Sequence, residues 1–98
     1  MSVTVLQRWI VTEMASATHR AKQARASWLK YGATDFRFDQ VFTGPHTGHV
    51  IISVVLPDMA TFAKAQAAVA TATAKLKAAA TKGGDILVDR EIWRSVDI

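Results

Sequence analysis

The sequence predicts an α+β fold of the ferredoxin-like type, in the order β-α-β-β-α-β, with a four-stranded antiparallel sheet and two helices on one face. Two stretches with helical periodicity, Glu13 to Tyr31 and Asp58 to Lys82, each lie between runs of β-branched and aromatic residues. A turn-rich segment from Thr43 to His49 separates the two middle strands. Because these elements fill the chain almost without remainder, we expect residues 1–98 to form a single domain.

The first strand and the first helix are both predicted by periodicity. Every second residue of the strand faces the helices, and these residues are Val3, Val5, Gln7, Trp9 and Val11. The helix carries a stripe of small or apolar residues at intervals of three and four, made of Met14, Ala17, Ala21, Ala24 and Trp28. We expect Thr12 to be the N-cap and Gly32 to follow the helix in the left-handed conformation.

The hairpin between the middle strands predicts which residues share a face of the sheet. We expect Phe42 to pair with Val50 and Phe36 to pair with Leu56. The residues that this register places under the helices are Phe36, Phe38, Gln40, Phe42, Val50, Ile52, Val54 and Leu56. This face is nearly all large and apolar, so it is expected to form the core.

The second helix and the last strand complete the pattern. Asp58 after Pro57 marks the start of the helix, and Gly83 with Gly84 marks its end. Its apolar stripe is Phe62, Ala65, Val69, Ala72, Leu76 and Ala79. Alanine buries little area, so this helix depends more on propensity than on packing. In the last strand, Val88, Arg90 and Ile92 are expected on the helix side.

The opposite face of the sheet carries more apolar residues than a solvent-facing surface would. They are Leu6, Ile10, Val41, Ile51 and Val55. Contiguous exposed apolar area usually marks an interface. We therefore expect a homodimer formed through this sheet face.

Several residues together resemble a known superfamily. The hairpin from Val41 to Gly48, and the aliphatic strand that leads into Pro57, Asp58 and Met59, look like the dimeric α+β barrel superfamily. Within it the chain looks most like small proteins of the NIPSNAP type or the antibiotic-biosynthesis-monooxygenase type. The resemblance implies a homodimer with a ligand cleft between sheet and helices. Some members are cofactor-independent monooxygenases of aromatic polyketides, and others degrade haem with an Asn, a Trp and a His. Gln7 is expected near the position of that Asn on the first strand, whereas this chain has no matched pair of Trp and His.

Polar residues that interrupt the helix-side face are candidates for ligand binding. Gln7, Gln40 and Arg90 each lie between apolar neighbours on their strands. One interpretation is that they pair with the backbone or with one another, which would satisfy buried polar groups. The other is that they orient a small ligand against apolar walls supplied by Trp9, Trp28 and the phenylalanines, with Tyr31 capping the cleft.

Composition excludes some functions. The chain has no cysteine, so disulfides, thiolate catalysis and cysteine-based zinc sites are excluded. His46 and His49 are interpreted as turn residues and His19 as a solvated helix residue, so no metal site is expected. The net charge of +4 is scattered along the helices, which does not favour a nucleic-acid partner. With no signal peptide and no apolar run of about 18 residues, we expect a soluble, cytoplasmic protein without membrane contact.

Three functional hypotheses follow from the sequence. The first is a small-molecule-binding protein that holds an aromatic ligand in the sheet–helix cleft. The second is a cofactor-independent monooxygenase acting on an aromatic or polyketide-like substrate. The third is a non-catalytic structural dimer. No catalytic residue is assigned, and no cofactor is expected.

Overall fold

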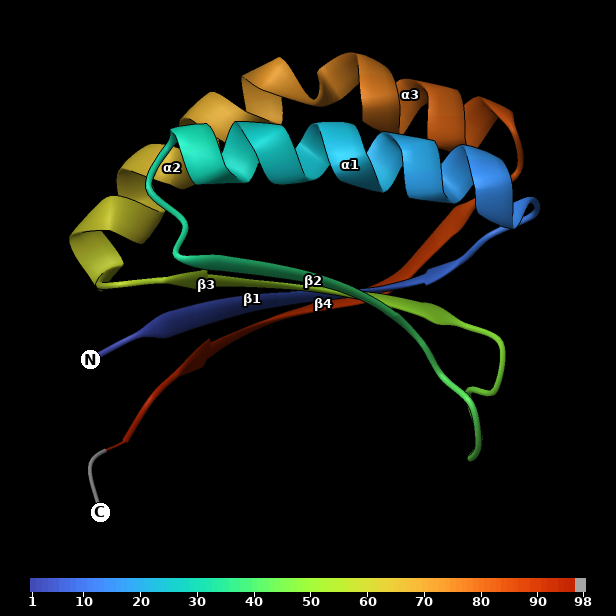
Figure 1. Ribbon diagram of the computed structural model, residues 1–98, viewed down its shortest axis with the longest axis horizontal. Coiled ribbons are helices and arrows are strands. Elements are labelled where there is room, and N and C mark those ends of the chain that lie inside the picture. Colours follow the sequence, from blue (N-terminus) through green and yellow to red (C-terminus); the bar gives the residue numbers. More distant parts are fainter. Residues whose placement is uncertain (97–98) are drawn as a thin grey trace.

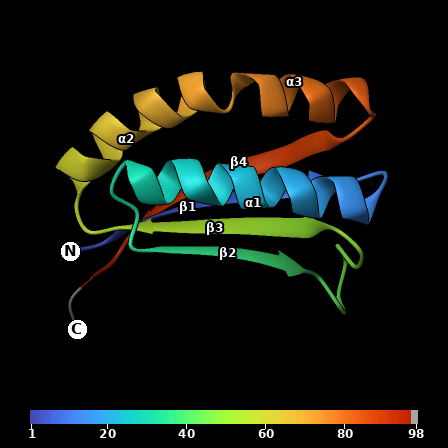
Figure 2. The ribbon, with the colours of Figure 1, turned by 45° about the horizontal axis from the view of Figure 1, so that its top comes forward.

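The computed structural model describes residues 1–96, which form one antiparallel sheet covered on one face by helices (Figure 1). The elements are β1 (Val3–Ile10), α1 (Met14–Lys30), β2 (Asp35–Gln40), β3 (Val50–Leu56), α2 (Met59–Ala72), α3 (Ala74–Lys82) and β4 (Ile86–Arg94). The strand order is β2-β3-β1-β4, so the first and third strands are central. This arrangement confirms the predicted ferredoxin-like fold. Figure 2 shows α1 lying beside the α2–α3 segment above the sheet.

The N-cap of α1 is Glu13, and the prediction of Thr12 was wrong by one residue. The Glu13 carboxylate accepts hydrogen bonds from the backbone amides of Ala15 and Ser16 and from the hydroxyl of Ser16. The side-chain hydrogen bond from Ser16 is the main cause that lowers the pKa of Glu13. Thr12 takes another role, because its hydroxyl donates to the Asp85 carboxylate, 3.1 Å away.

The predicted end of the first helix and the predicted start of the second are both confirmed. Gly32 follows α1 with a φ of 109°, and the amide of Ala33 donates to the Trp28 carbonyl over 3.0 Å, as in a Schellman motif. A Cβ on Gly32 would lie 2.8 Å from the Thr61 side chain, so a larger residue would also force that side chain to shift. Asp58 caps α2, and the hydrogen bond from the Thr61 amide, 2.7 Å long, lowers the pKa of Asp58.

The second helix is not continuous as predicted, because it is interrupted at Thr73. The Thr73 hydroxyl donates to the Val69 carbonyl over 2.7 Å, and such back-bonding is known to bend helices. The inward stripe continues after Val69 with Thr73 and Ala80, whereas Ala72 and Ala79, expected on that stripe, are exposed. The interruption therefore leaves α2 and α3 as two separate segments over the sheet.

The hairpin register differs from the prediction by two residues. Val50 pairs with Gln40, where Phe42 was expected. The amide of Val41 donates to the His49 carbonyl over 2.8 Å and closes the loop, so Phe42 lies beyond the sheet with 90% of its surface exposed. A shift of two residues keeps each side chain on its predicted face. The predicted faces are thus correct, but Phe42 is not part of the core.

The hydrophobic core occupies one end of the molecule, under α2 and the end of α1. Its buried residues are Val3, Val5, Trp28, Val54, Leu56, Phe62, Ala65 and Val69. The strand residues in this set come from the start of β1 and the end of β3, which are neighbours in the antiparallel pair. The other end of the sheet, under α3 and the start of α1, is not filled in this way.

The face of the sheet opposite the helices is open among the described residues. Leu6 is 8% exposed there, Ile10 is 40% exposed and Trp93 is 51% exposed. Arg8 and Asp89 form an ion pair of 2.6 Å on this face. The β2–β3 hairpin and the end of β4 curve away from the helices on this side (Figure 1). None of the described helices has both the length and the hydropathy to cross a membrane.

Candidate functional site

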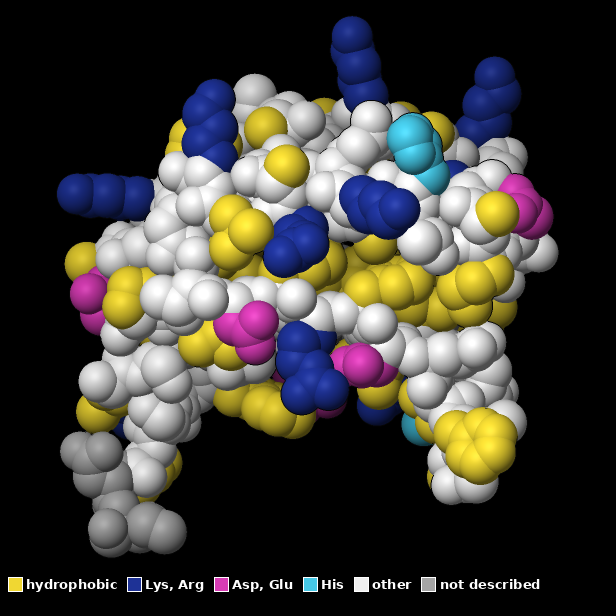
Figure 3. Space-filling view, viewed as in Figure 1, with side chains coloured by type: hydrophobic (Ala, Val, Ile, Leu, Met, Phe, Trp, Pro, Cys, Tyr) yellow, Lys and Arg dark blue, Asp and Glu magenta, His cyan; other side chains and the backbone are white. Residues whose placement is uncertain are grey.

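A cavity of about 1000 Å³ lies between the sheet and the helices, at the end of the sheet that the core does not fill. Its walls come from all four strands and from α1, α2 and α3. Hydrophobic side chains are visible in the hollow between α1 and the sheet (Figure 3). This volume is at the upper end of the range typical for small-molecule sites. The cleft predicted between sheet and helices therefore exists.

The cavity is open because the helices face it with alanine. The small residues that line it are Ala17, Ala21, Ala24, Ala70, Ala74, Ala78 and Ala80. The aromatic residues that line it are Trp9, Trp28, Phe36 and Phe38. Small side chains on the helices and large flat ones on the strands and on α1 leave a space with aromatic walls, which suits the apolar body of a planar molecule.

Gln7 and Arg90 lie side by side at the edge of this cavity. They are direct partners in the antiparallel ladder of β1 and β4, so their side chains project from the same face. The Gln7 Oε1 atom accepts a hydrogen bond from Trp9 Nε1 over 3.0 Å. Arg90 Nη2 donates to Gln66 Oε1 of α2 over 3.0 Å. Two polar groups expected to face the helices are thus held in place by two further side chains.

A β-bulge in β4 determines which aliphatic residue of that strand lines the cavity near Gln7 and Arg90. Arg8 pairs with Asp89, but the next residue, Trp9, pairs with Leu87, so Val88 is an extra residue in the ladder. Leu87 lines the cavity in the place where Val88 was expected, and Val88 is 42% exposed. The expectation for Val88 was therefore wrong, because simple alternation does not anticipate a bulge.

Of the six residues predicted to bind a ligand, Gln7, Trp9, Trp28 and Arg90 line the cavity, and two lie outside its lining. Tyr31 follows the last turn of α1, is 36% exposed, and has the Lys30 ammonium 5.5 Å from its ring centroid. Gln40 is exposed at the end of β2, where its Nε2 atom donates to the Gly48 carbonyl over 3.4 Å. The binding role of the first four residues stays a prediction.

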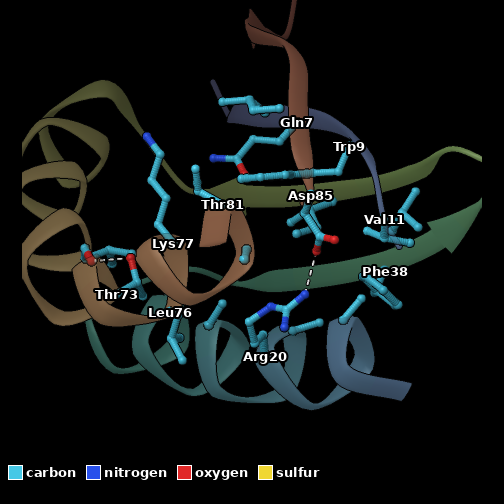
Figure 4. A pocket seen from close by; sticks show the side chains of 18 of the residues that line it. Gln7, Trp9, Val11, Arg20, Phe38, Thr73, Leu76, Lys77, Thr81 and Asp85 are labelled. Atoms are coloured by element: carbon cyan, nitrogen blue, oxygen red, sulfur yellow. Dashed lines mark hydrogen bonds and ion pairs between the residues drawn. The ribbon is translucent and has the colours of Figure 1, made fainter. Parts of the chain in front are cut away.

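Asp85 is a cavity residue that sequence analysis missed. It is 6% exposed, and its carboxylate accepts from the Thr12 amide at 2.9 Å and from Arg20 Nη2 at 2.5 Å (Figure 4). These donors offset the desolvation cost of the buried charge. The only sequence signal was an acidic residue between Gly84 and an aliphatic run, while Arg20 read as one of several surface charges.

The charged residues around the cavity are mostly cations. Arg20, Lys77, Lys82 and Arg90 line it, and Asp85 is the only carboxylate among the described lining residues. Because Asp85 is paired with Arg20, the remaining cations give the cavity a positive potential. Such a lining favours ligands that carry an anionic oxygen.

The residues described contain no cluster of three or more metal-ligating side chains. His46 and His49 lie near each other at the hairpin, with ring centroids 5.2 Å apart, but neither lines the cavity. The cavity therefore offers hydrogen-bond donors, cations and aromatic surfaces to a ligand.

Solved structures of other proteins have the same fold as this chain. No family model and no curated protein matches the sequence. Among solved structures, the chain resembles SnoaB, a cofactor-independent oxygenase from Streptomyces nogalater, with a TM-score of 0.72 and 15% identity over 99% of this chain and 95% of that one. It also resembles MupZ from Pseudomonas fluorescens, with a TM-score of 0.68 and 15% identity over 93% and 69% of the two chains.

A third structure is a dimeric ferredoxin-like protein from an uncultured marine organism. Its TM-score is 0.64, with 11% identity over 100% of this chain and 99% of that one. The chain shares the ferredoxin-like fold of these solved structures. At these identities the likeness establishes the fold alone, so the function has to be argued from the cavity.

Proposed function

We propose that this protein binds a planar aromatic molecule with an acidic oxygen in the cavity between its sheet and helices. The observation that carries the proposal is the pairing of aromatic walls with two adjacent donors, Gln7 and Arg90, in a cavity of about 1000 Å³. Trp9 and Trp28 would stack against the apolar body of the ligand. The two donors would hold its oxygen, with the positive potential of the lining adding to the attraction.

Binding can be measured with anthracene-2-carboxylate, whose own fluorescence anisotropy reports the complex without use of protein tryptophans. We expect saturable binding to the wild-type protein. Gln7→Leu should weaken it by about 1 kcal/mol, because one hydrogen bond to the ligand is lost. The matched control is Gln40→Leu, the same change at a glutamine outside the cavity lining, and it should leave affinity unchanged. Equal effects of the two substitutions would contradict the proposed site.

Cofactor-independent oxygenation is a second candidate function, favoured by the likeness to SnoaB over nearly the whole chain. In such a reaction the deprotonated substrate supplies the electrons, so that a CH₂ group and O₂ give a carbonyl group and water. The chain would contribute Gln7 and Arg90 to stabilise the substrate oxyanion, and the apolar walls to exclude bulk water. No residue is assigned as the base.

Anthrone is a suitable test substrate, since one molecule of O₂ converts it to anthraquinone and water. We expect oxygen uptake with chelator present and without added cofactor, at a rate above that in protein-free buffer. Gln7→Leu should lower this rate and Gln40→Leu should not. If oxygen uptake equals the protein-free rate while anthracene-2-carboxylate binds tightly, the result supports the binding function and contradicts oxygenase activity towards anthrone.

We further propose that the protein is a homodimer joined through the open face of its sheet. The proposal is supported by the apolar residues Leu6, Ile10, Ile51 and Val55 on that face and by the dimeric ferredoxin-like structural neighbour. A dimer that binds neither anthracene-2-carboxylate nor anthrone would instead fit the non-catalytic structural hypothesis.

A further inference from the structure

The hydrogen bond between Trp9 and Gln7 determines how the Gln7 amide is oriented. An indole N–H is a donor only, so the atom that lies 3.0 Å from Trp9 Nε1 has to be the amide oxygen of Gln7. The amide NH₂ group then lies on the other side of the side chain. Figure 4 shows Gln7 and Trp9 next to each other on β1, both reaching into the cavity. Gln7 therefore presents a donor to a ligand.

The neighbouring groups make this edge of the cavity rich in hydrogen-bond donors. Arg90, the cross-strand partner of Gln7, has no acceptor atom, and Gln66 holds one end of its guanidinium with an oxygen over 3.0 Å. The carboxylate of Asp85 is occupied by Arg20 and Thr12. A ligand N–H or O–H that approaches the NH₂ side of the Gln7 amide meets another donor, and the one remaining lone pair of the amide oxygen lies on the side held by Trp9.

We propose that Trp9 is a positioning residue that fixes the Gln7 amide as a donor. The cavity then prefers a planar ligand with an oxyanion to one with a neutral N–H donor at the same position. This inference rests on the proposed binding function. It assigns to Trp9 a role beyond that of an aromatic wall. Trp28 also lines the cavity and belongs to the hydrophobic core, but the hydrogen bond that Gln7 Oε1 accepts from an indole comes from Trp9.

The test compares two probes with the same ring system and the same position of substitution, anthracene-2-carboxylate and 2-aminoanthracene, by fluorescence anisotropy of the anthracene. The measured quantity is the ratio of their dissociation constants, which cancels changes in stacking. Wild-type protein should prefer the carboxylate. Trp9→Phe keeps an aromatic ring but removes the N–H donor, and should reduce the preference about five- to tenfold, the equivalent of one net hydrogen bond.

A double-mutant cycle shows whether Trp9 acts through Gln7. In a Gln7→Leu background, Trp9→Phe should change the ratio no further, because the amide that it orients is gone. The matched control is Trp28→Phe, which should weaken both probes equally and leave the ratio unchanged. Circular dichroism of each variant verifies that the fold is retained.

Two results would overturn the inference, and they are distinguishable. If the wild-type protein binds neither probe at their highest soluble concentrations, the proposed function fails and the inference fails with it. If both probes bind but Trp9→Phe leaves the ratio of dissociation constants unchanged, or changes it equally with and without Gln7, the binding function stands. Trp9 then contributes only aromatic contact with the ligand.

Discussion

Filling the cavity with a larger side chain should stabilise the protein and weaken ligand binding. Ala24 of α1 lines the cavity and is half-buried, so Ala24→Leu would place three more carbon atoms inside it. Full burial of three carbons contributes about 2.4 kcal/mol at ~0.8 kcal/mol each. Loss of rotamer freedom of the leucine costs about 0.5–1 kcal/mol. We expect a net gain of about 1.4–1.9 kcal/mol, or roughly 6–15 °C in melting temperature for a domain of this size.

The control for this experiment is Ala26→Leu on the exposed face of the same helix. Helix propensity changes equally in the two variants, so their difference in unfolding free energy isolates burial in the cavity. Urea unfolding followed by circular dichroism gives the stabilities, and anisotropy of anthracene-2-carboxylate gives the affinities. Ala24→Leu should lose at least tenfold in affinity, about 1.4 kcal/mol, and Ala26→Leu should lose none. Equal stabilities of the two variants, or undiminished binding by Ala24→Leu, would refute the reasoning.

Three further predictions concern the assembly and the charged groups. Ile51→Lys should dissociate the proposed dimer, because an unpaired charge in each copy of the interface costs several kcal/mol; sedimentation of the wild-type protein as a monomer would contradict this. Asp85→Ala should destabilise the fold by about 3 kcal/mol in urea unfolding, because it leaves Arg20 unpaired, and adding Arg20→Met should recover part of the loss. Since the folded-state pKa values of Glu13 and Asp58 are lowered, their stabilising effect is present above their unfolded pKa values, near pH 4, and is lost as the pH falls through the folded values. Asp58→Asn keeps a good N-cap and should reduce the difference between urea midpoints at neutral and acidic pH; an unchanged difference would argue against this origin.

Local patterns in the sequence were sufficient for the fold. Alternation in the strands and three–four spacing in the helices determine which side chains face each other, and these are properties of neighbouring residues. Asp58 and Gly32 were identified in advance because the physics of a helix end depends on one or two side chains. The hairpin register was wrong by two residues because loop closure at Val41 and His49 is set by hydrogen bonds that composition does not reveal.

The candidate site was predictable only in part, for a related reason. Gln7 and Arg90 were recognised because each is polar on an otherwise apolar face, and strand pairing then brings them together. The ion pair of Arg20 with Asp85 joins residues 65 positions apart, and neither position looks unusual by itself. The bulge at Val88 was likewise invisible, since it alters one pairing without altering the alternation of residue types.

The indole N–H resonances of the tryptophans provide the most direct test of binding in the cavity. Trp9 and Trp28 line the cavity, whereas Trp93 pairs with Thr4 and lies on the opposite face of the sheet. In a ¹H–¹⁵N titration with anthracene-2-carboxylate, we predict that the indole signals of Trp9 and Trp28 shift in a saturable manner while that of Trp93 stays in place. Saturable shifts of Trp93 alone, or no shift of any indole signal, would contradict a ligand site between the sheet and the helices.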